Sequence, residues 1–294
     1  SMKHNLTITA VLLIMFIITQ FIGLYVVNFY LQEDKELPYG MESPKIEKER
    51  DFYTIFPSII IAFIIAISLL FLLTKFKVEI FLKFWFFVVV IIALGLTFTS
   101  FFPGIKYASL IVLIIALPLA YIKIYKREFL IHNLTELFIY PGIAAVFVPL
   151  LNIWTIVILL ILISIYDIWA VWHSGIMQKM AKYQINKLNI FSGFFVPYVS
   201  KKIKLKLKMM KKSKKKKIRV NIAILGGGDV IFPIITAGVM LKTLGFLGAL
   251  FVIIGATLGL GYLFFFAEKK KFYPAMPYIT AGIFAGIILS YILL

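Results

Sequence analysis

The feature that most constrains this chain is a series of nine apolar runs, each close to the length of about 20 residues that a helix needs to cross the hydrocarbon core of a bilayer. The chain is 62% hydrophobic and only 15% charged, whereas a soluble domain is roughly half apolar and a quarter charged. We therefore predict an all-α polytopic membrane protein with nine transmembrane helices. These spans are expected near residues 6–31, 55–74, 84–102, 105–122, 134–152, 153–173, 221–241, 244–267 and 273–294.

The boundary between the fifth and sixth spans is the weakest of the series, because no charged residue separates them. It depends on Pro149 and Asn152. Elsewhere the basic residues predict the orientation. If the N-terminus shares one side with the even-numbered loops, that side carries 25 of the 31 Lys and Arg residues and the other side carries 6. Basic residues concentrate in cytoplasmic loops, so we expect the N-terminus in the cytoplasm and the C-terminus outside.

Most of the positive charge lies between the sixth and seventh spans. Residues 174–220 hold 15 basic residues and no acid, with the densest part from Lys201 to Arg219. Two interpretations stay open: attachment to anionic lipid headgroups, at about 1 kcal/mol per basic residue, or a disordered loop that only fixes topology. Nucleic-acid binding is not expected, since a membrane-tethered lysine run needs no nucleic acid to explain it. Residues 176–191 mix apolar side chains with single lysines, as in surface-lying helices.

Two aspartates stand inside the apolar runs, Asp167 in the sixth span and Asp229 in the seventh. A carboxylate in hydrocarbon costs about 3 kcal/mol on insertion scales, so its presence indicates function. Neither run contains a Lys or Arg that could neutralise it. Asp167 lies six residues before His173 and Asp229 eight residues after Asn221, at the cytoplasmic ends of their spans. These offsets are about 9 and 12 Å of helix, so antiparallel neighbours would hold both carboxyls at a similar depth.

A close pair of carboxyl groups suggests acid–base chemistry. Two such groups cannot both ionise readily, and they share one proton over a useful pH range. The ionised member can activate a water, while the protonated member hydrogen-bonds a peptide carbonyl on which charge develops. This is the way paired aspartates hydrolyse peptide bonds. The pair titrates as a unit, so the sequence does not assign the two roles.

Three consecutive glycines, Gly226, Gly227 and Gly228, precede Asp229. Each costs roughly 1 kcal/mol relative to alanine inside a helix. The run therefore favours an unwound segment or the close approach of another backbone, such as an extended, strand-paired substrate. Packing through small residues is the alternative, and it is the one we prefer for the Gly-xxx-Gly pairs of the eighth and ninth spans.

Three short motifs lie in order on the sixth, seventh and ninth spans: Tyr166-Asp167, Gly226-Gly227-Gly228-Asp229 and Pro274-Ala275-Met276. They resemble the YD, GxGD and PAL motifs of the presenilin and signal peptide peptidase family, which are intramembrane aspartyl proteases of nine spans. The resemblance implies a presenilin-like fold in one integral membrane domain. Residues 2–152 would then be a scaffold of five helices, and residues 153–294 a catalytic part of four helices that includes the basic cytoplasmic loop 174–220.

The same resemblance implies roles for individual residues. Asp167 and Asp229 would be the catalytic pair. The motif neighbours would shape the site and help to bind substrate: Tyr166, Gly226, Gly227, Gly228, Pro274, Ala275 and Met276. Met276 stands where the family usually has leucine, a volume-conserving change, and Gly227 occupies the variable position of the motif, where leucine is frequent.

The predicted orientation is that of the presenilin branch, which implies membrane-protein substrates with a cytoplasmic C-terminus. The compact, lysine- and isoleucine-rich chain looks most like a microbial, archaeal homologue in the cell membrane. No cofactor or metal is expected, since no ligand spacing links His4, His132 and His173. Glu136 and Glu268 are expected near span boundaries, where water is available, and none of these residues is expected to be catalytic.

Three other functions are considered as alternatives. A proton- or ion-coupled transporter could use the two acids as a relay, although nine spans without matching halves fit inverted repeats poorly. A prepilin peptidase also uses GxGD, but the segment at Pro274 has no counterpart in that family. A catalytically silent scaffold is the third. The sequence leaves homo-oligomerisation and the natural substrate open.

Overall fold

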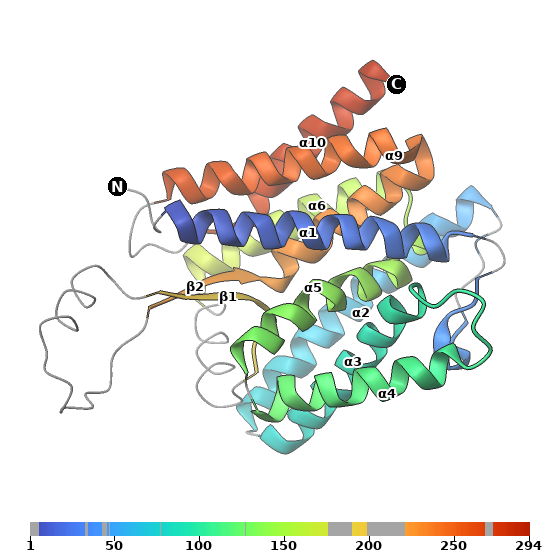
Figure 1. Cartoon of the computed structure of the whole chain (residues 1–294). Coiled ribbons are helices and arrows are strands. Elements are labelled where there is room, and N and C mark those ends of the chain that lie inside the picture. Colours follow the sequence, from blue (N-terminus) through green and yellow to red (C-terminus); the bar gives the residue numbers. More distant parts are fainter. Residues whose placement is uncertain are drawn as a thin grey trace, which may run out of the picture.

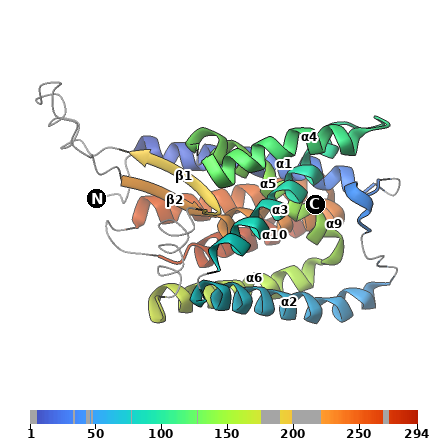
Figure 2. The same cartoon turned by 90° about the horizontal axis from the view of Figure 1, so that it is seen from below.

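A computed structural model of the chain describes residues 6–32, 35–42, 46, 48–76, 78–126, 128–175, 190–198, 221–267 and 273–294. These residues form a multi-pass helical bundle with a single two-stranded sheet at one end (Figures 1 and 2). The long helices are α1 (Leu6–Tyr30), α2 (Glu49–Lys75), α3 (Glu79–Thr99), α4 (Ala108–Tyr121), α5 (Phe129–Phe147), α6 (Ile153–Ile168), α9 (Gly227–Phe266) and α10 (Met276–Leu293). The short elements are η1 (Pro38–Gly40), η2 (Ile122–Lys126), η3 (Val148–Leu150), η4 (Trp169–His173), β1 (Gly193–Tyr198) and β2 (Asn221–Gly226).

The break between the fifth and sixth predicted spans is present. Helix α5 passes into η3, which contains Pro149, and α6 begins immediately after Asn152. The Asn152 side chain accepts a hydrogen bond from the backbone N–H of Thr155, and the Thr155 hydroxyl accepts one from the Asn152 N–H, each at 2.9 Å. This reciprocal cap satisfies donors at the helix start that otherwise have no partner.

Within the described ranges, eight stretches are long and apolar enough to cross a membrane, against the nine predicted. The difference arises in α9, whose 40 residues contain most of the seventh predicted span and nearly all of the eighth. Gly245 interrupts the helix with φ 76° and ψ −168°, a backbone conformation that glycine adopts without a steric penalty. Figure 1 shows α9 turning back on itself, so that its second part runs beside α10. The count of nine and the orientation in the membrane remain predictions.

The prediction of a helix over residues 221–226 is wrong, because these residues form the strand β2. It pairs antiparallel with β1, in a register that runs from Gly193 opposite Gly226 to Tyr198 opposite Asn221. The side chains of β2 alternate, with Leu225 buried and its neighbour Ile224 exposed, as a strand with one covered face requires. The predicted surface helix at 176–191 and the lipid-binding segment at 201–219 lie almost wholly outside the described residues.

The main apolar core is formed by α1, α5, α6, α9 and α10, which surround the end of the sheet. A second, smaller core joins α3, α4 and α5. Polar contacts join the helices that carry the site. Gln20 of α1 donates from Nε2 to the carbonyl oxygen of Val230 in the first turns of α9, at 3.1 Å, and α5 lies against the strand β1. The beginning of α9 is therefore bonded directly to α1, and it is connected to α5 through the two strands of the sheet.

The second part of α9 and α10 pack through glycines, as the sequence suggested for this region. A Cβ atom at Gly255 would collide with the carbonyl oxygen of Gly282. We expect Gly255→Ala to lower the free energy of unfolding by about 1–3 kcal/mol, because the two backbones would have to move apart. At Gly261 of the same helix, an added Cβ would have no neighbour within 4 Å apart from the adjoining backbone of its own helix, so Gly261→Ala should be neutral or stabilising by up to about 1 kcal/mol. The measurement is the midpoint of thermal unfolding of both variants in the same detergent. Equal midpoints would contradict the close packing of α9 against α10 at Gly255.

Candidate active site

Asp167 lies one residue before the end of α6 and is only 6% exposed. Its Oδ2 accepts a hydrogen bond from the backbone N–H of Met276 at 3.0 Å, and the Ala275 backbone contributes a second interaction. Met276 begins α10, where backbone N–H groups have no partner within the helix. Two hydroxyls, of Ser164 and Thr280, meet at 2.9 Å and join the same two helices. The Asp167 carboxylate therefore caps α10 and is fixed by it.

Asp229 is the third residue of α9 and lies in its first turn, where the helix dipole favours negative charge. The Gly226 backbone forms a hydrogen bond with its carboxylate. Gly226 is also the last residue of β2, so the strand passes directly into the helix that carries Asp229. The junction places this carboxylate beside the end of the sheet.

The structure brings the two aspartates close enough for an electrostatic interaction. In the part of the chain that the structure describes, neither forms an ion pair with Lys or Arg; the ion pairs there involve Glu136. The first basic residue after Asp229 is Lys242, which donates to two carbonyl oxygens at the α5–α6 connection, at 3.3 and 2.6 Å. The two acids thus lie within range of each other's charge, and neither has a cationic partner among the described residues.

The glycines before Asp229 occupy different environments. The Gly227 N–H donates to the carbonyl oxygen of Ser192 at 3.2 Å, and a Cβ at Gly227 would lie 2.5 Å from Ser192 Oγ and 2.8 Å from Tyr140 Oη. The close approach that three glycines predict is therefore found at Gly227. At Gly228 a Cβ would meet only the ring of Phe232, at 3.9 Å, which is ordinary contact.

This difference gives a matched pair of variants. Gly227→Ala should lower the free energy of unfolding by about 1–3 kcal/mol, since Ser192 and Tyr140 would have to move. Gly228→Ala should leave folding unchanged or slightly more favourable, because the added methyl group has room. The check is the unfolding midpoint of both proteins in the same detergent. A Gly228→Ala protein less stable than Gly227→Ala would contradict the assignment of the crowded position.

The remaining motif residues differ in how far they are buried. Pro274 and Met276 are buried, and Ala275 is partly buried, beside Asp167. Tyr166 is 43% exposed, with its ring 6.4 Å from that of Trp169. No described contact joins it to the second aspartate. The π-helical turn η4 follows directly on α6, and such turns are frequent at functional sites.

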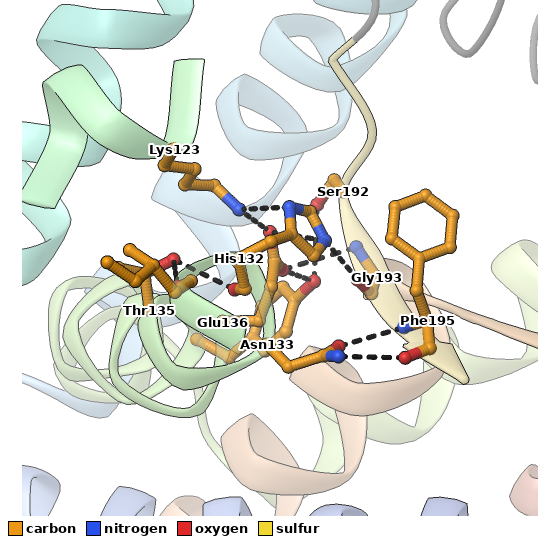
Figure 3. Close-up of polar contacts among 10 residues, drawn as sticks. Lys123, His132, Asn133, Thr135, Glu136, Ser192, Gly193 and Phe195 are labelled. Carbon is orange, nitrogen blue, oxygen red and sulfur yellow. Dashed lines mark hydrogen bonds and ion pairs between the residues drawn. The ribbon is translucent and has the colours of Figure 1, made fainter. Parts of the chain in front are cut away.

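One buried polar cluster beside the site was missed. Glu136 is 1% exposed and His132 is 8% exposed, so the expectation of water around Glu136 is wrong. Glu136 forms an ion pair with the buried Lys123 and accepts a hydrogen bond from Tyr140 Oη. Figure 3 shows Lys123, His132 and Glu136 beside Gly193 at the start of β1. The only feature of the sequence that points to this ion pair is the position of Lys123 and Glu136 near the ends of neighbouring apolar runs.

Comparison with known proteins places the chain in a family. A family model described as "Signal-peptide peptidase, presenilin aspartyl protease" matches residues 10–294. Two solved structures share the fold, each described as a "presenilin family intramembrane aspartate protease", in space groups P2 and C222. The first is 18% identical with a TM-score of 0.61, covering 96% of this chain and 97% of that chain. The second is 17% identical with a TM-score of 0.64, covering 97% and 99%.

A comparison with curated proteins found no match. The family model nevertheless spans nearly the whole sequence, including all three motifs. The chain therefore belongs to the signal-peptide peptidase and presenilin family of aspartyl proteases.

Proposed function

We propose that this protein hydrolyses peptide bonds within transmembrane segments of other membrane proteins, with Asp167 and Asp229 as the catalytic pair. The observation that supports the proposal is that α6 and α9 bring these two carboxylates within range of each other's charge, in an apolar helical bundle and without a basic partner among the described residues. Family membership agrees with this chemistry.

In the proposed reaction the pair holds one proton between two carboxyl groups. The ionised carboxylate takes a proton from a water as the water oxygen attacks the scissile carbonyl carbon. The protonated carboxyl donates to the carbonyl oxygen, which gives a neutral tetrahedral intermediate. Transfer of a proton to the amide nitrogen then lets the C–N bond break and releases an amine and a carboxylic acid. The Met276 N–H fixes the orientation of Asp167 throughout.

The β1–β2 sheet offers a way to bind the substrate. In the described residues it has two strands, and β2 pairs with β1 on one edge only. The other edge of β2 can pair with an extended substrate strand, and β2 leads into Asp229. A substrate helix has to unwind before its scissile amide is exposed. The outer edge of β2 can replace the backbone hydrogen bonds that the substrate loses when it unwinds. The glycines Gly226–Gly228 and the segment Pro274–Met276 would line the path of that strand.

The first test compares the purified protein with Asp229→Asn on a single-span substrate whose C-terminus is cytoplasmic, with the products followed by mass spectrometry. We expect cleavage inside the span that disappears in the variant. Equal cleavage by both proteins would indicate a contaminating protease and remove Asp229 from the mechanism. If neither protein cleaves a panel of substrates but the wild type conducts ions in liposomes, and Asp229→Asn does not, the transporter would replace the protease.

A further inference from the structure

A cluster of side chains from the α4–α5 region binds the edge of β1 that faces away from β2, and we call it the α5 clamp. Its members are Lys123, His132, Asn133, Glu136 and Tyr140. Lys123 comes from η2 and the other four from α5 (Figure 3). Asn133 is half-buried, and the other four are buried.

The clamp binds both backbone groups of Gly193. The Gly193 N–H donates to Glu136 Oε2 at 3.2 Å, and its carbonyl oxygen lies 2.8 Å from His132 Nε2. Lys123 Nζ lies 3.1 Å from His132 Nδ1 and also donates to Glu136. An ammonium group has no lone pair, so Nδ1 is the acceptor and Nε2 carries the hydrogen that it donates to Gly193. One histidine tautomer therefore satisfies every contact.

The clamp binds Phe195 in the same way. Asn133 Oδ1 accepts from the Phe195 N–H at 2.9 Å, and Asn133 Nδ2 donates to the Phe195 carbonyl oxygen at 2.7 Å. Residues two apart in a strand present their backbone groups to the same edge. The side chains of α5 thus take the place that a third strand would occupy beside Gly193 and Phe195. This edge of the sheet is closed.

The clamp also reaches the residue that begins α9. Tyr140 Oη donates to Glu136 and lies 3.3 Å from Ser192 Oγ. The carbonyl oxygen of Ser192 accepts from the N–H of Gly227, which is two residues before Asp229. A continuous set of hydrogen bonds therefore links the buried ion pair to the turn that carries one of the proposed catalytic carboxylates.

We infer that the α5 clamp is a positioning device that holds the β1–β2 sheet in place beside Asp229 and so determines which peptide bond of a substrate is cut. The inference rests on the proposed function. Among the described residues, the clamp occupies the edge of β1 that faces away from β2, so a substrate strand has only the outer edge of β2 on which to pair. The clamp holds that edge in place beside Asp229 through the pairing of β1 with β2. The clamp residues are positioning residues, since none of them touches the two aspartates through a described hydrogen bond.

The test uses Asn133→Ala, which removes both hydrogen bonds to Phe195 from a half-buried position. Its matched control is Thr135→Val, because the Thr135 hydroxyl is buried on the same helix but bonds only to carbonyl oxygens of α5. Two readouts are compared with the wild type: amide hydrogen exchange over residues 190–198, and the masses of the cleavage products. Exchange reports local opening and needs no proteolysis.

We expect exchange in residues 190–198 to become at least about tenfold faster in Asn133→Ala, since the lost hydrogen bonds favour opening. Products shifted by one or more residues should appear beside the original ones, and Thr135→Val should change neither readout. Unchanged exchange would show that the clamp does not hold β1. Faster exchange with unchanged product masses would reduce the clamp to a structural support and overturn the inference.

The same experiment separates this inference from the proposed function. A wild-type protein that cleaves no substrate would overturn the protease, and with it the claim about cleavage position, whereas exchange would still decide whether α5 holds the hairpin. If Asn133→Ala fails to fold, the variant Asn133→Asp, which keeps the acceptor for the Phe195 N–H and loses only the donor to its carbonyl oxygen, is measured in its place. Identical product masses in that variant, together with faster exchange, would count against the inference in the same way.

Discussion

Asp167→Asn is expected to lower the cleavage rate by about 10²- to 10⁴-fold, the range for loss of a general acid or base, while the fold is retained. The asparagine Oδ1 can still accept the hydrogen bond that Met276 donates at 3.0 Å, so the start of α10 keeps its cap. The amide, however, cannot exchange a proton with water or substrate. Initial rates of product formation, with matched unfolding midpoints, check both parts of this expectation.

The variant Asp167→Ala separates the chemical role from the structural one. It removes the acceptor for Met276 as well, and an unpaired buried N–H costs about 1–3 kcal/mol, so both the rate and the unfolding midpoint should fall. If Asp167→Asn retains more than a tenth of the wild-type rate, Asp167 is a helix cap and not a catalytic group.

Glu136→Leu is expected to lower the free energy of unfolding by about 3–5 kcal/mol, the cost of breaking a buried ion pair from one side. It leaves the Lys123 ammonium buried without its carboxylate, and it removes the acceptor for Tyr140 Oη and the Gly193 N–H. Unfolding by denaturing detergent in mixed micelles measures the change. Glu128→Gln, at an exposed acid just before the same helix, is the control and should change stability by less than about 0.5 kcal/mol.

A second substitution shows how much of that loss comes from the uncompensated charge. Lys123→Met in the Glu136→Leu background removes the orphaned ammonium, and replacement of both partners of a buried pair is often nearly neutral. Recovery should be partial, because Tyr140 and Gly193 still lack their acceptor. A double variant as unstable as Glu136→Leu alone would show that Lys123 carries no destabilising charge there.

The sequence predicted those parts of the fold that depend on local composition. Runs of about 20 apolar residues gave the helices, and the pair Pro149 and Asn152 gave the break between α5 and α6. Asp167 and Asp229 could be singled out, because an isolated carboxylate in an apolar run is costly wherever its neighbours lie. Such arguments need no knowledge of tertiary contacts.

The errors came from contacts between distant segments. Residues 221–226 were predicted to begin a helix, because a short apolar run does not distinguish a helix from a strand. Their partner strand β1 is separated from them in sequence by a long basic segment. Glu136 read as a boundary residue because its partners, Lys123 and Gly193, are separated from it in sequence and show no regular spacing. The exposure of Tyr166 likewise could not be deduced from a motif alone.

In the part of the chain that the structure describes, the edge of β2 that faces away from β1 has no partner strand, and this has a consequence for the resting protein. Lipid chains offer no hydrogen bonds, so backbone groups at membrane depth that lack a protein partner must be hydrated or remain costly. The strand leads directly to Asp229, so water that solvates N–H and C=O groups left without a partner among the described residues would lie next to the carboxylate that we propose to be catalytic. A bilayer is a poor place to find the co-reactant of a hydrolysis. A strand edge without a partner would thus keep a supply of that co-reactant next to the proposed catalytic pair.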